Sequence, residues 1–494
     1  MVKFNQKKVL YVIILYGKDF LAIMDERTAK NYSLIMRNIL SYLPSRILII
    51  LNSIIIIPIF AHILDTKQMS IFLIVTQMLN IMLTCTFDWI TKAVLRFHEK
   101  YRFQGMIDAL FSTVFWISII AYVLIFISYF IFKDIISAKF AINNLTFLLT
   151  IFLVIPCSIR QFLYQILRIK NQAKLYTLSI LLYQFSFIAL FLCIYQILPN
   201  ASAVLIAMNI AIFAIDIYII RSIKFNYKLS VCIDKSIAFE VLKYALPLIF
   251  TNSCYWYVLN IAKFSFQHNQ DYLNTAIAGT AWMLASSITP FMTVFIFASF
   301  PIIVKKFELK KRFKQYYTNM LQLYCFIFIP MVSIFCFYSK EIIQIVLPEK
   351  YASVAYILPF FALSGFLHEL MKLINIKYHL KIKTYVEMLI AGCIAVSAYF
   401  LNIGLISKFA VMGAGIALFA TELALILVNI LTGAKNLDYI NYKSLAKTFI
   451  CVCLLGLTSF WVLNWFDCNN IVKIILYSCL YVLACTILRK RILS

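Results

Sequence analysis

The sequence predicts an all-α polytopic membrane protein with about fourteen transmembrane helices. Long apolar segments recur along almost the whole chain, and 63% of the residues are hydrophobic, with a mean hydropathy of +0.91. The loops between these segments are too short to fold as domains. Each segment is long enough to cross a hydrocarbon core of about 30 Å at about 1.5 Å per helical residue. The function must therefore reside in the helical bundle itself.

The expected spans follow the apolar runs in order. They cover residues 43–62, 71–95, 110–132, 143–165, 175–197, 201–221, 244–264, 275–304, 317–338, 354–374, 386–404, 409–431, 446–464 and 470–487. Spans 5 and 6 are separated only by Pro199-Asn200, which predicts a tight outer turn. Residues 1–33 form an N-terminal extension. It is either an interfacial segment or lies upstream of a biological start at Met24 or Met36.

The basic residues predict the orientation of the bundle. Of the 45 Lys and Arg residues, 37 fall on the side of the two termini and 8 on the opposite side. Basic loops stay in the cytoplasm, so both termini are expected to be cytoplasmic. The net charge of +25 is explained by this bias and by attraction to anionic membrane lipids. Without a basic-aromatic motif, it does not indicate a nucleic-acid partner.

Several functional classes are excluded by what the chain does not contain. Most of the 13 cysteines lie inside spans, none form a CxxC pair, and the five histidines show no zinc-binding pattern. We expect no metal site, no structural disulfide and no cofactor. No P-loop is present, so nucleotide hydrolysis by that route is not expected. Transport across the bilayer, rather than an enzymatic reaction, is the function that remains.

Span 2 has the richest set of polar side chains inside an apolar helix. They follow each other at steps of four: Thr76, Asn80, Thr84, Asp88, Lys92 and Arg96. Neighbours at this spacing lie one above another on a helix, which favours a span that lines a water-filled cavity. The alternative is an Asp88–Lys92 pair with a snorkelling Arg96, all marking the cytoplasmic edge.

Other ionisable residues lie near the ends or the middle of spans. Glu422 is close to mid-depth in span 12 and Asp216 near the inner end of span 6, so a functional role is favoured for both. Lys263 is the lone cation near the outer end of span 7. The remaining residues have anchoring at the interface as a competing interpretation, and they are Arg46, Arg160, Lys372 and Glu387.

Residues 401–428 carry a recognisable motif. The matching positions are Asn402, Leu405, Ile406, Gly413, Ala414 and Ala417, whereas Ser407, Ala410 and Gly415 depart from the pattern. With this motif, the chain resembles Wzx-type lipid-linked oligosaccharide flippases of the MOP exporter superfamily. The segment from Ile57-Pro58 to Leu64, Arg96 at the end of span 2, the Tyr244–Pro247 start of span 7 and Pro301 agree in place.

The resemblance implies two six-helix lobes, residues 34–222 and 223–433, around a central cavity, with two additional helices and a cytoplasmic tail in residues 434–494. It also implies a bacterial cytoplasmic (inner) membrane location and a role in O-antigen or capsule biosynthesis beside a polysaccharide polymerase. The implied substrate is an undecaprenyl-pyrophosphate-linked oligosaccharide repeat unit. A drug/cation antiporter of the same superfamily is the main alternative, and a membrane-bound polymerase is a weaker one.

Two sets of side chains suit such a substrate and its coupling ion. The diphosphate is anionic and binds cations and hydrogen-bond donors, which gives the candidate substrate-binding residues Arg46, Asn80, Thr84, Lys92, Arg96, Arg160 and Lys263. Carboxylates inside the spans could carry a coupling proton or cation, and these are Asp88, Asp216 and Glu422.

Overall fold

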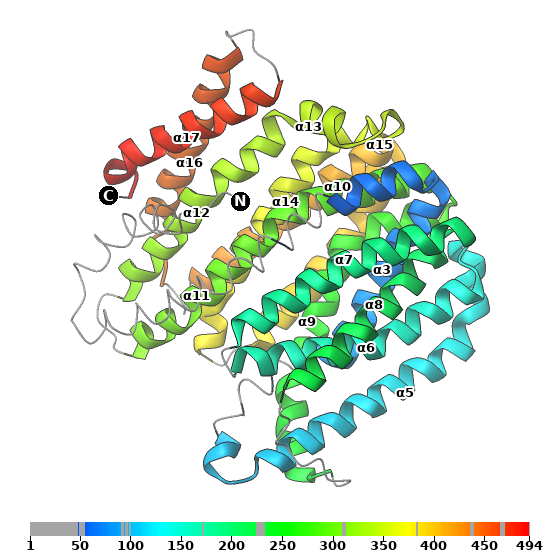
Figure 1. Ribbon diagram of the computed structural model, residues 1–494. Helices are drawn as coiled ribbons and strands as arrows, with labels where there is room; N and C mark the ends of the chain where they lie inside the picture. The colour runs from blue at the N-terminus through cyan, green and yellow to red at the C-terminus, as the bar shows by residue number, and fades with distance from the viewer. Residues whose placement is uncertain are drawn as a thin grey trace.

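The computed structural model describes residues 55–89, 100–169, 172–223, 233–308, 313–381, 384–434, 439–464 and 470–493, with the single residues 48, 93 and 97. Within these residues, all regular secondary structure is helical (Figure 1). The extension 1–33 and three candidate cations, Arg46, Lys92 and Arg96, lie outside the described residues.

Apart from α13 (Ser339–Val346), which lies between predicted spans 9 and 10, the helices follow the predicted spans in order. The N-terminal helices are α3 (Thr66–Leu83), α5 (Ile107–Phe140), α6 (Asn144–Ile169), α7 (Ala173–Ile197) and α8 (Ala201–Ser222). The C-terminal helices are α9 (Lys235–His268), α10 (Tyr272–Ala285), α11 (Thr289–Glu308), α12 (Phe313–Phe337), α13 (Ser339–Val346), α14 (Val354–Leu380) and α15 (Thr384–Ala434). The final pair is α16 (Tyr442–Asn464) and α17 (Asn470–Leu493).

Ten helices in the described part of the chain are long and apolar enough to cross a membrane, which makes this a multi-pass membrane protein. One of them, α15, covers two predicted spans. Helix α9 is not among the ten, and it carries Asn252, Asn260 and Lys263 within its length.

Predicted span 8 is interrupted in the structure. Helix α10 ends in a short 3-10 turn, Ser286–Ile288, before α11 begins at Thr289. Pro290 follows directly, and a proline lacks the backbone N–H that would continue the hydrogen bonding of a helix. The interruption therefore has a local cause in the sequence, although hydropathy alone does not reveal it.

The loop expected between spans 11 and 12 is replaced by a sharp reversal inside α15. Ala410 has φ 46° and ψ −129°, a conformation that glycine adopts far more readily. A Cβ on Gly413 would lie 2.1 Å from the carbonyl oxygen of Leu405. Residues eight apart in a straight helix are separated by about 12 Å, so the chain folds back on itself here. The motif positions Ala410 and Gly413 thus lie where α15 turns back on itself as a helical hairpin without a loop.

The helices pack into two sets that meet along few elements. Helix α6 contacts α3, α5, α7 and α8, whereas α14 contacts α10, α11, α12, α13 and α15. The main contacts between the sets are α10 on α3, and α9 on α3 and α5. Helices α16 and α17 pack on α12 and lie at one end of the molecule, with α5 at the opposite end (Figure 1).

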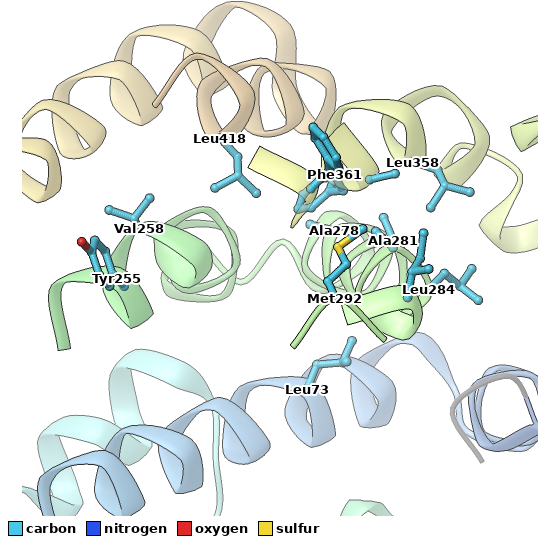
Figure 2. Packing of buried hydrophobic residues seen from close by; sticks show 14 of the residues in the cluster. Leu73, Tyr255, Val258, Ala278, Ala281, Leu284, Met292, Leu358, Phe361 and Leu418 are labelled. Carbon is cyan, nitrogen blue, oxygen red and sulfur yellow. The ribbon is translucent and has the colours of Figure 1, made fainter. Parts of the chain in front are cut away.

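Small side chains allow the two sets to approach closely. Figure 2 shows Ala278 and Ala281 of α10 between Leu73 of α3 and Phe361 of α14. All four side chains are buried. A Cβ on Gly279 of α10 would lie 2.5 Å from Leu73 Cδ1, so a larger residue here would require the Leu73 side chain to move. Small residues serve this purpose in membrane bundles, where packing rather than water exclusion drives association.

Candidate substrate and coupling sites

The polar row of span 2 is held by a turn of π-helix over Thr84–Asp88. The Thr84 hydroxyl donates to the Asn80 carbonyl oxygen at 2.9 Å and lies 3.2 Å from Asp88 Oδ2. The Cys85 thiol lies close enough to Asp88 and to Ser253 of α9 for both to act on it electrostatically. Single π-turns within α-helices are frequent at functional sites. The structure thus brings Thr84 and Asp88 together, as the spacing predicts, through a turn that the spacing does not predict.

Asn80 lies one turn above this site and is exposed. Its amide donates to Gln77 Oε1 at 3.3 Å, and the Gln77 carbonyl accepts a 3.1 Å hydrogen bond from Trp256 Nε1 of α9. The exposed face of α3 is therefore anchored directly to the C-terminal helices at this depth.

Arg160 and Asp216 lie near each other among the N-terminal helices. The Arg160 guanidinium stacks over the ring of Tyr183, 4.2 Å from its centroid. Asp216 is 3% exposed, and neither carboxylate oxygen has a hydrogen-bond partner among the described residues. Arg160 acts on Asp216 electrostatically without forming an ion pair with it in this part of the structure. A buried carboxylate of this kind is costly and usually serves a function.

Lys263 is enclosed between α9 and α10. Its Nζ lies 2.6 Å from Asn260 Oδ1 and 5.6 Å from the ring centroid of Trp282, and the residue is 2% exposed. The amide oxygen and the aromatic face share its charge. An anionic substrate would reach Lys263 only if α9 and α10 separated.

Glu422 has a partner that the sequence analysis did not assign. His368 of α14 places Nδ1 3.1 Å from Glu422 Oε1, and both side chains are buried. The other oxygen, Oε2, has no hydrogen-bond partner among the described residues. The ring of His368 meets the ring of Tyr255 edge to face, with centroids 5.5 Å apart. One oxygen of the mid-depth Glu422 carboxylate therefore has a partner and the other has none in the described structure. The residues of this cluster come from α9, α14 and α15.

A second buried carboxylate lies closer to the predicted inner end of the bundle. Glu387 Oε1 accepts from Asn375 Nδ2 at 3.0 Å and from the Tyr255 hydroxyl at 3.4 Å. His379 Nε2 lies 3.3 Å from Glu387 Oε2. Anchoring at the interface was a competing interpretation for Glu387, but this residue is 7% exposed and belongs to a polar network.

A third buried carboxylate, Glu369, is paired within its own helix. It lies 2.6 Å from Lys372 Nζ and within 3.4 Å of the Thr293 hydroxyl of α11. The side chain of Lys372 is 44% exposed, so one end of this pair reaches an open surface.

The sequence contained a signal for this network. His368, Lys372, Asn375 and His379 recur at steps of three and four along α14, the same kind of row that identified span 2. The row is harder to recognise because it lies near a predicted cytoplasmic end, where charged residues are ordinary.

The two sets of helices are bridged at both ends. At the predicted outer end, Lys350 Nζ donates to the Leu64 carbonyl at 3.0 Å, and Gln267 Nε2 donates to the Phe140 carbonyl at 2.6 Å. At the predicted inner end, Glu240 of α9 accepts hydrogen bonds from Lys100 Nζ and the Tyr101 hydroxyl, both at 2.6 Å.

The surroundings change two pKa values at the inner end. Burial and the hydrogen bond to Glu240 raise the pKa of Tyr101 to about 12. The pKa of Asp234 is lowered by hydrogen bonds from Ser236 and Ile237 at the start of α9. The Asp234 backbone N–H also donates to Thr113 of α5 at 3.0 Å.

A multi-pass helical bundle with buried ionisable groups and bridges at both ends has the architecture of a membrane transporter. The structure is similar to a lipid II flippase, MurJ, in an inward closed conformation, with a TM-score of 0.68 and 16% identity over 92% of this chain and 100% of that one. It is also similar to an inward-facing MATE-family multidrug resistance transporter of the MOP superfamily, with a TM-score of 0.55 and 15% identity over 82% and 93% of the chains. For a eukaryotic MATE transporter, AtDTX14, the TM-score is 0.50 and the identity is 12%, over 84% of this chain and 97% of that one.

These identities are low, so the likeness is one of fold. The chain has the fold of MOP-superfamily transporters, as the resemblance implied. No protein-family model matches it. No curated protein sequence matches it either.

Proposed function

We propose that the protein flips undecaprenyl-pyrophosphate-linked oligosaccharide repeat units from the cytoplasmic to the outer leaflet by alternating access. The principal support is the similarity to a lipid II flippase across 92% of this chain, compared with 82% and 84% for the multidrug and eukaryotic MATE transporters. The proposal places the protein in the bacterial inner membrane, with both termini cytoplasmic, as part of O-antigen or capsule biosynthesis.

In this proposal, the N-terminal helices receive the diphosphate. Arg160 lies in their buried part beside Asp216, which is without a hydrogen-bond partner in the described structure. Arg46, Lys92 and Arg96 complete the proposed cationic set. Asn80 and Thr84 of the same N-terminal helices, and Lys263 of the C-terminal helix α9, are proposed as further contacts. Arg suits this role because its planar guanidinium can bind two phosphate oxygens at once. Asp88, Asp216 and Glu422 are proposed to carry the coupling proton or cation.

A cation antiporter of the MATE type is the second candidate. The buried carboxylates Glu369, Glu387 and Glu422 favour it, because a cationic substrate needs an acidic cavity. Each of these three carboxylates, however, already contacts Lys or His within the bundle. This pairing leaves less free negative charge for a cationic drug than the number of acids suggests.

Deleting the gene distinguishes the two candidates. We expect surface polysaccharide to be lost and lipid-linked repeat units to accumulate inside the cell, with both effects reversed by the wild-type gene on a plasmid. Normal surface polysaccharide combined with altered sensitivity to cationic dyes would support the antiporter instead.

Complementation of the deletion strain also tests the span 2 cations. Arg96→Ala and Lys92→Ala are expected to impair transport at normal membrane abundance, with Arg96→Lys rescuing only partly. Full activity of Asp88→Ala/Lys92→Ala together with a silent Arg96→Ala would remove this segment from the substrate path.

Orientation can be tested by labelling single cysteines in intact cells. We expect a cysteine at position 270 to be modified and one at position 310 to be protected, since the basic loop 306–314 should be cytoplasmic. The reverse pattern would contradict the proposed orientation.

A further inference from the structure

A chain of polar side chains runs through the C-terminal helices. It begins at His379 at the end of α14, which lies 3.3 Å from Glu387, and Glu387 accepts from the Tyr255 hydroxyl at 3.4 Å. The ring of Tyr255 meets the ring of His368 edge to face, with centroids 5.5 Å apart. His368 in turn lies 3.1 Å from Glu422. Three helices contribute to it, so it exists only in the folded bundle.

The two ends of this row of polar side chains differ in their access to water. Glu422 is fully buried, and its Oε2 has no partner among the described residues. The side chain of His379 is 33% exposed and lies in the last turn of α14. The chain therefore joins a closed interior site to the predicted cytoplasmic end of the bundle.

We propose that this chain is a proton path, and that Glu422 and His368 form the proton-binding site at its inner limit. The inference rests on the proposed transport function and deepens it by naming the coupling ion and its exit route. A proton fits this site better than a metal cation. Hard cations need several oxygen ligands, whereas the Glu422 carboxylate contacts an imidazole nitrogen through Oε1 and has no partner at Oε2 among the described residues.

The transfer conserves protons at every group. The Glu422 carboxyl passes its proton to His368 Nδ1, and the imidazolium releases its other ring proton to the Tyr255 hydroxyl. Tyr255 passes its own proton to Glu387, which passes it to His379 and then to water. Glu422 has then lost one proton and water has gained it. His368 and His379 each keep one ring proton, now on the other nitrogen, so each imidazole must reorient before the next transfer.

One step in this sequence lacks a hydrogen bond in the structure. The rings of His368 and Tyr255 meet edge to face, so a ring rotation or an inserted water must complete the path there. This contact is where the path opens and closes. Because Tyr255 belongs to α9, which also contacts α3 and α5, movement between the two sets of helices would reach it directly.

The elements packed against α15 supply few other charges. These elements are α9, α10 and α14. Helix α10 carries no ionisable side chain except Tyr272 at its start. Helix α14 adds Glu369, which is paired with Lys372, and Lys377, whose Nζ donates to the Asn429 carbonyl at 2.5 Å. Tyr378 of α14 pairs with the Thr432 hydroxyl.

Helix α9 adds the buried Lys263, whose Nζ donates to Asn260, while its other charged side chains lie toward its two ends, and these are Lys235, Glu240, Lys243 and His268. The path uses the two His–Glu contacts among these groups.

The test follows the protonation of carboxyl groups by time-resolved infrared spectroscopy after a pH jump, with the full chain in lipid nanodiscs and no other substrate. Glu422→Gln is expected to remove one carboxyl band that appears as the pH falls. Tyr255→Phe keeps the ring contact and removes only the hydroxyl, so it should retain that band but slow its appearance by about tenfold or more. Tyr324→Phe is the matched control, because this buried hydroxyl donates to the Phe366 carbonyl and takes no part in the proposed proton path.

Equal rates for Tyr255→Phe, Tyr324→Phe and the unmodified protein would overturn the proposal. So would a band spectrum unchanged by Glu422→Gln. If Glu422→Gln does not fold, the rates of Tyr255→Phe and Tyr324→Phe still test whether the Tyr255 hydroxyl lies on the proton path. The readout needs no lipid-linked saccharide, so a normal proton path in a protein whose deletion leaves surface polysaccharide intact would contradict only the proposed function.

Discussion

The N-terminal and C-terminal helices treat buried charge in opposite ways. Among the C-terminal helices, Glu369, Glu387 and Glu422 all have a Lys or His within ion-pair distance. Among the N-terminal helices, Asp216 lacks a hydrogen-bond partner in the described structure, and Arg160, which acts on it electrostatically, stacks on Tyr183. In the C-terminal set, each of these carboxylates thus has a basic partner, although Oε2 of Glu422 has none in the described structure. In the N-terminal set, Asp216 has no such partner among the described residues.

The largest expected effect comes from breaking a completed pair. His368→Leu alone should destabilise the protein by roughly 3 kcal/mol, because it leaves Glu422 buried beside no partner. His368→Leu/Glu422→Met removes both members and should recover most of this loss. Thermal unfolding in detergent measures both variants. A double variant as unstable as the single one would show that the pair is not an energetic unit.

The hairpin that carries Glu387 and Glu422 comes next. Gly413→Ala should cost roughly 2 kcal/mol, since the new methyl group would meet the Leu405 backbone. Ala410→Gly should stabilise the protein by about 1 kcal/mol, because it relieves a conformation unfavourable for alanine. The shift in unfolding midpoint for each variant tests this, and shifts of equal sign would contradict the described reversal.

A smaller effect is expected where a charge lacks a partner. Asp216→Asn should be neutral or stabilising by about 1 kcal/mol, because it removes a buried charge that nothing fully compensates. Asp88→Asn is the matched control and should destabilise by a similar amount, since it weakens the contact with Thr84. Strong destabilisation by Asp216→Asn, measured in the same detergent, would indicate that Arg160 already neutralises it.

The smallest effects are expected at the inner bridge. Lys100 and Glu240 are 46% and 36% exposed, so Lys100→Gln should change stability by about 1 kcal/mol or less, and less still at high salt. The salt dependence of the unfolding midpoint measures this effect. A large change that salt does not reduce would mean that the bridge is effectively buried.

Tyr101 adds a pH dependence to the same bridge. Its folded pKa, about 12, lies above the ordinary value of 10.0, so the folded state favours the protonated phenol. This stability is fully present below pH 10 and is lost as the pH rises from 10 towards 12. Tyr101→Phe should remove this alkaline loss. An unchanged pH profile of unfolding in that variant would count against the hydrogen bond to Glu240.

Hydropathy predicted the order of the apolar helices because it is averaged over about twenty residues at a time. It did not predict features that depend on a single turn. The π-turn at Thr84–Asp88 and the interruption before Pro290 have causes too local for a span-length average. The reversal at Ala410 was hidden because the motif's usual glycine is absent at that position.

The candidate site was predicted unevenly for a similar reason. Spacing within one helix correctly joined Thr84 to Asp88, because neighbours four apart must meet. It could not join His368 to Glu422 or Tyr255 to Glu387, since these pairs lie 54 and 132 residues apart along the chain. Such contacts depend on how α9, α14 and α15 pack, which hydropathy does not specify.

The length of α5 has a practical consequence. Its 34 residues extend over about 51 Å, well beyond a hydrocarbon core of about 30 Å. Its last turns carry Lys133, Asp134 and Lys139, and they lead to Phe140, whose carbonyl accepts the Gln267 bridge. In the proposed orientation, this end lies on the outer face of the inner membrane. In right-side-out membrane vesicles, an antibody fragment against it would reach the bridge between Gln267 and Phe140 directly.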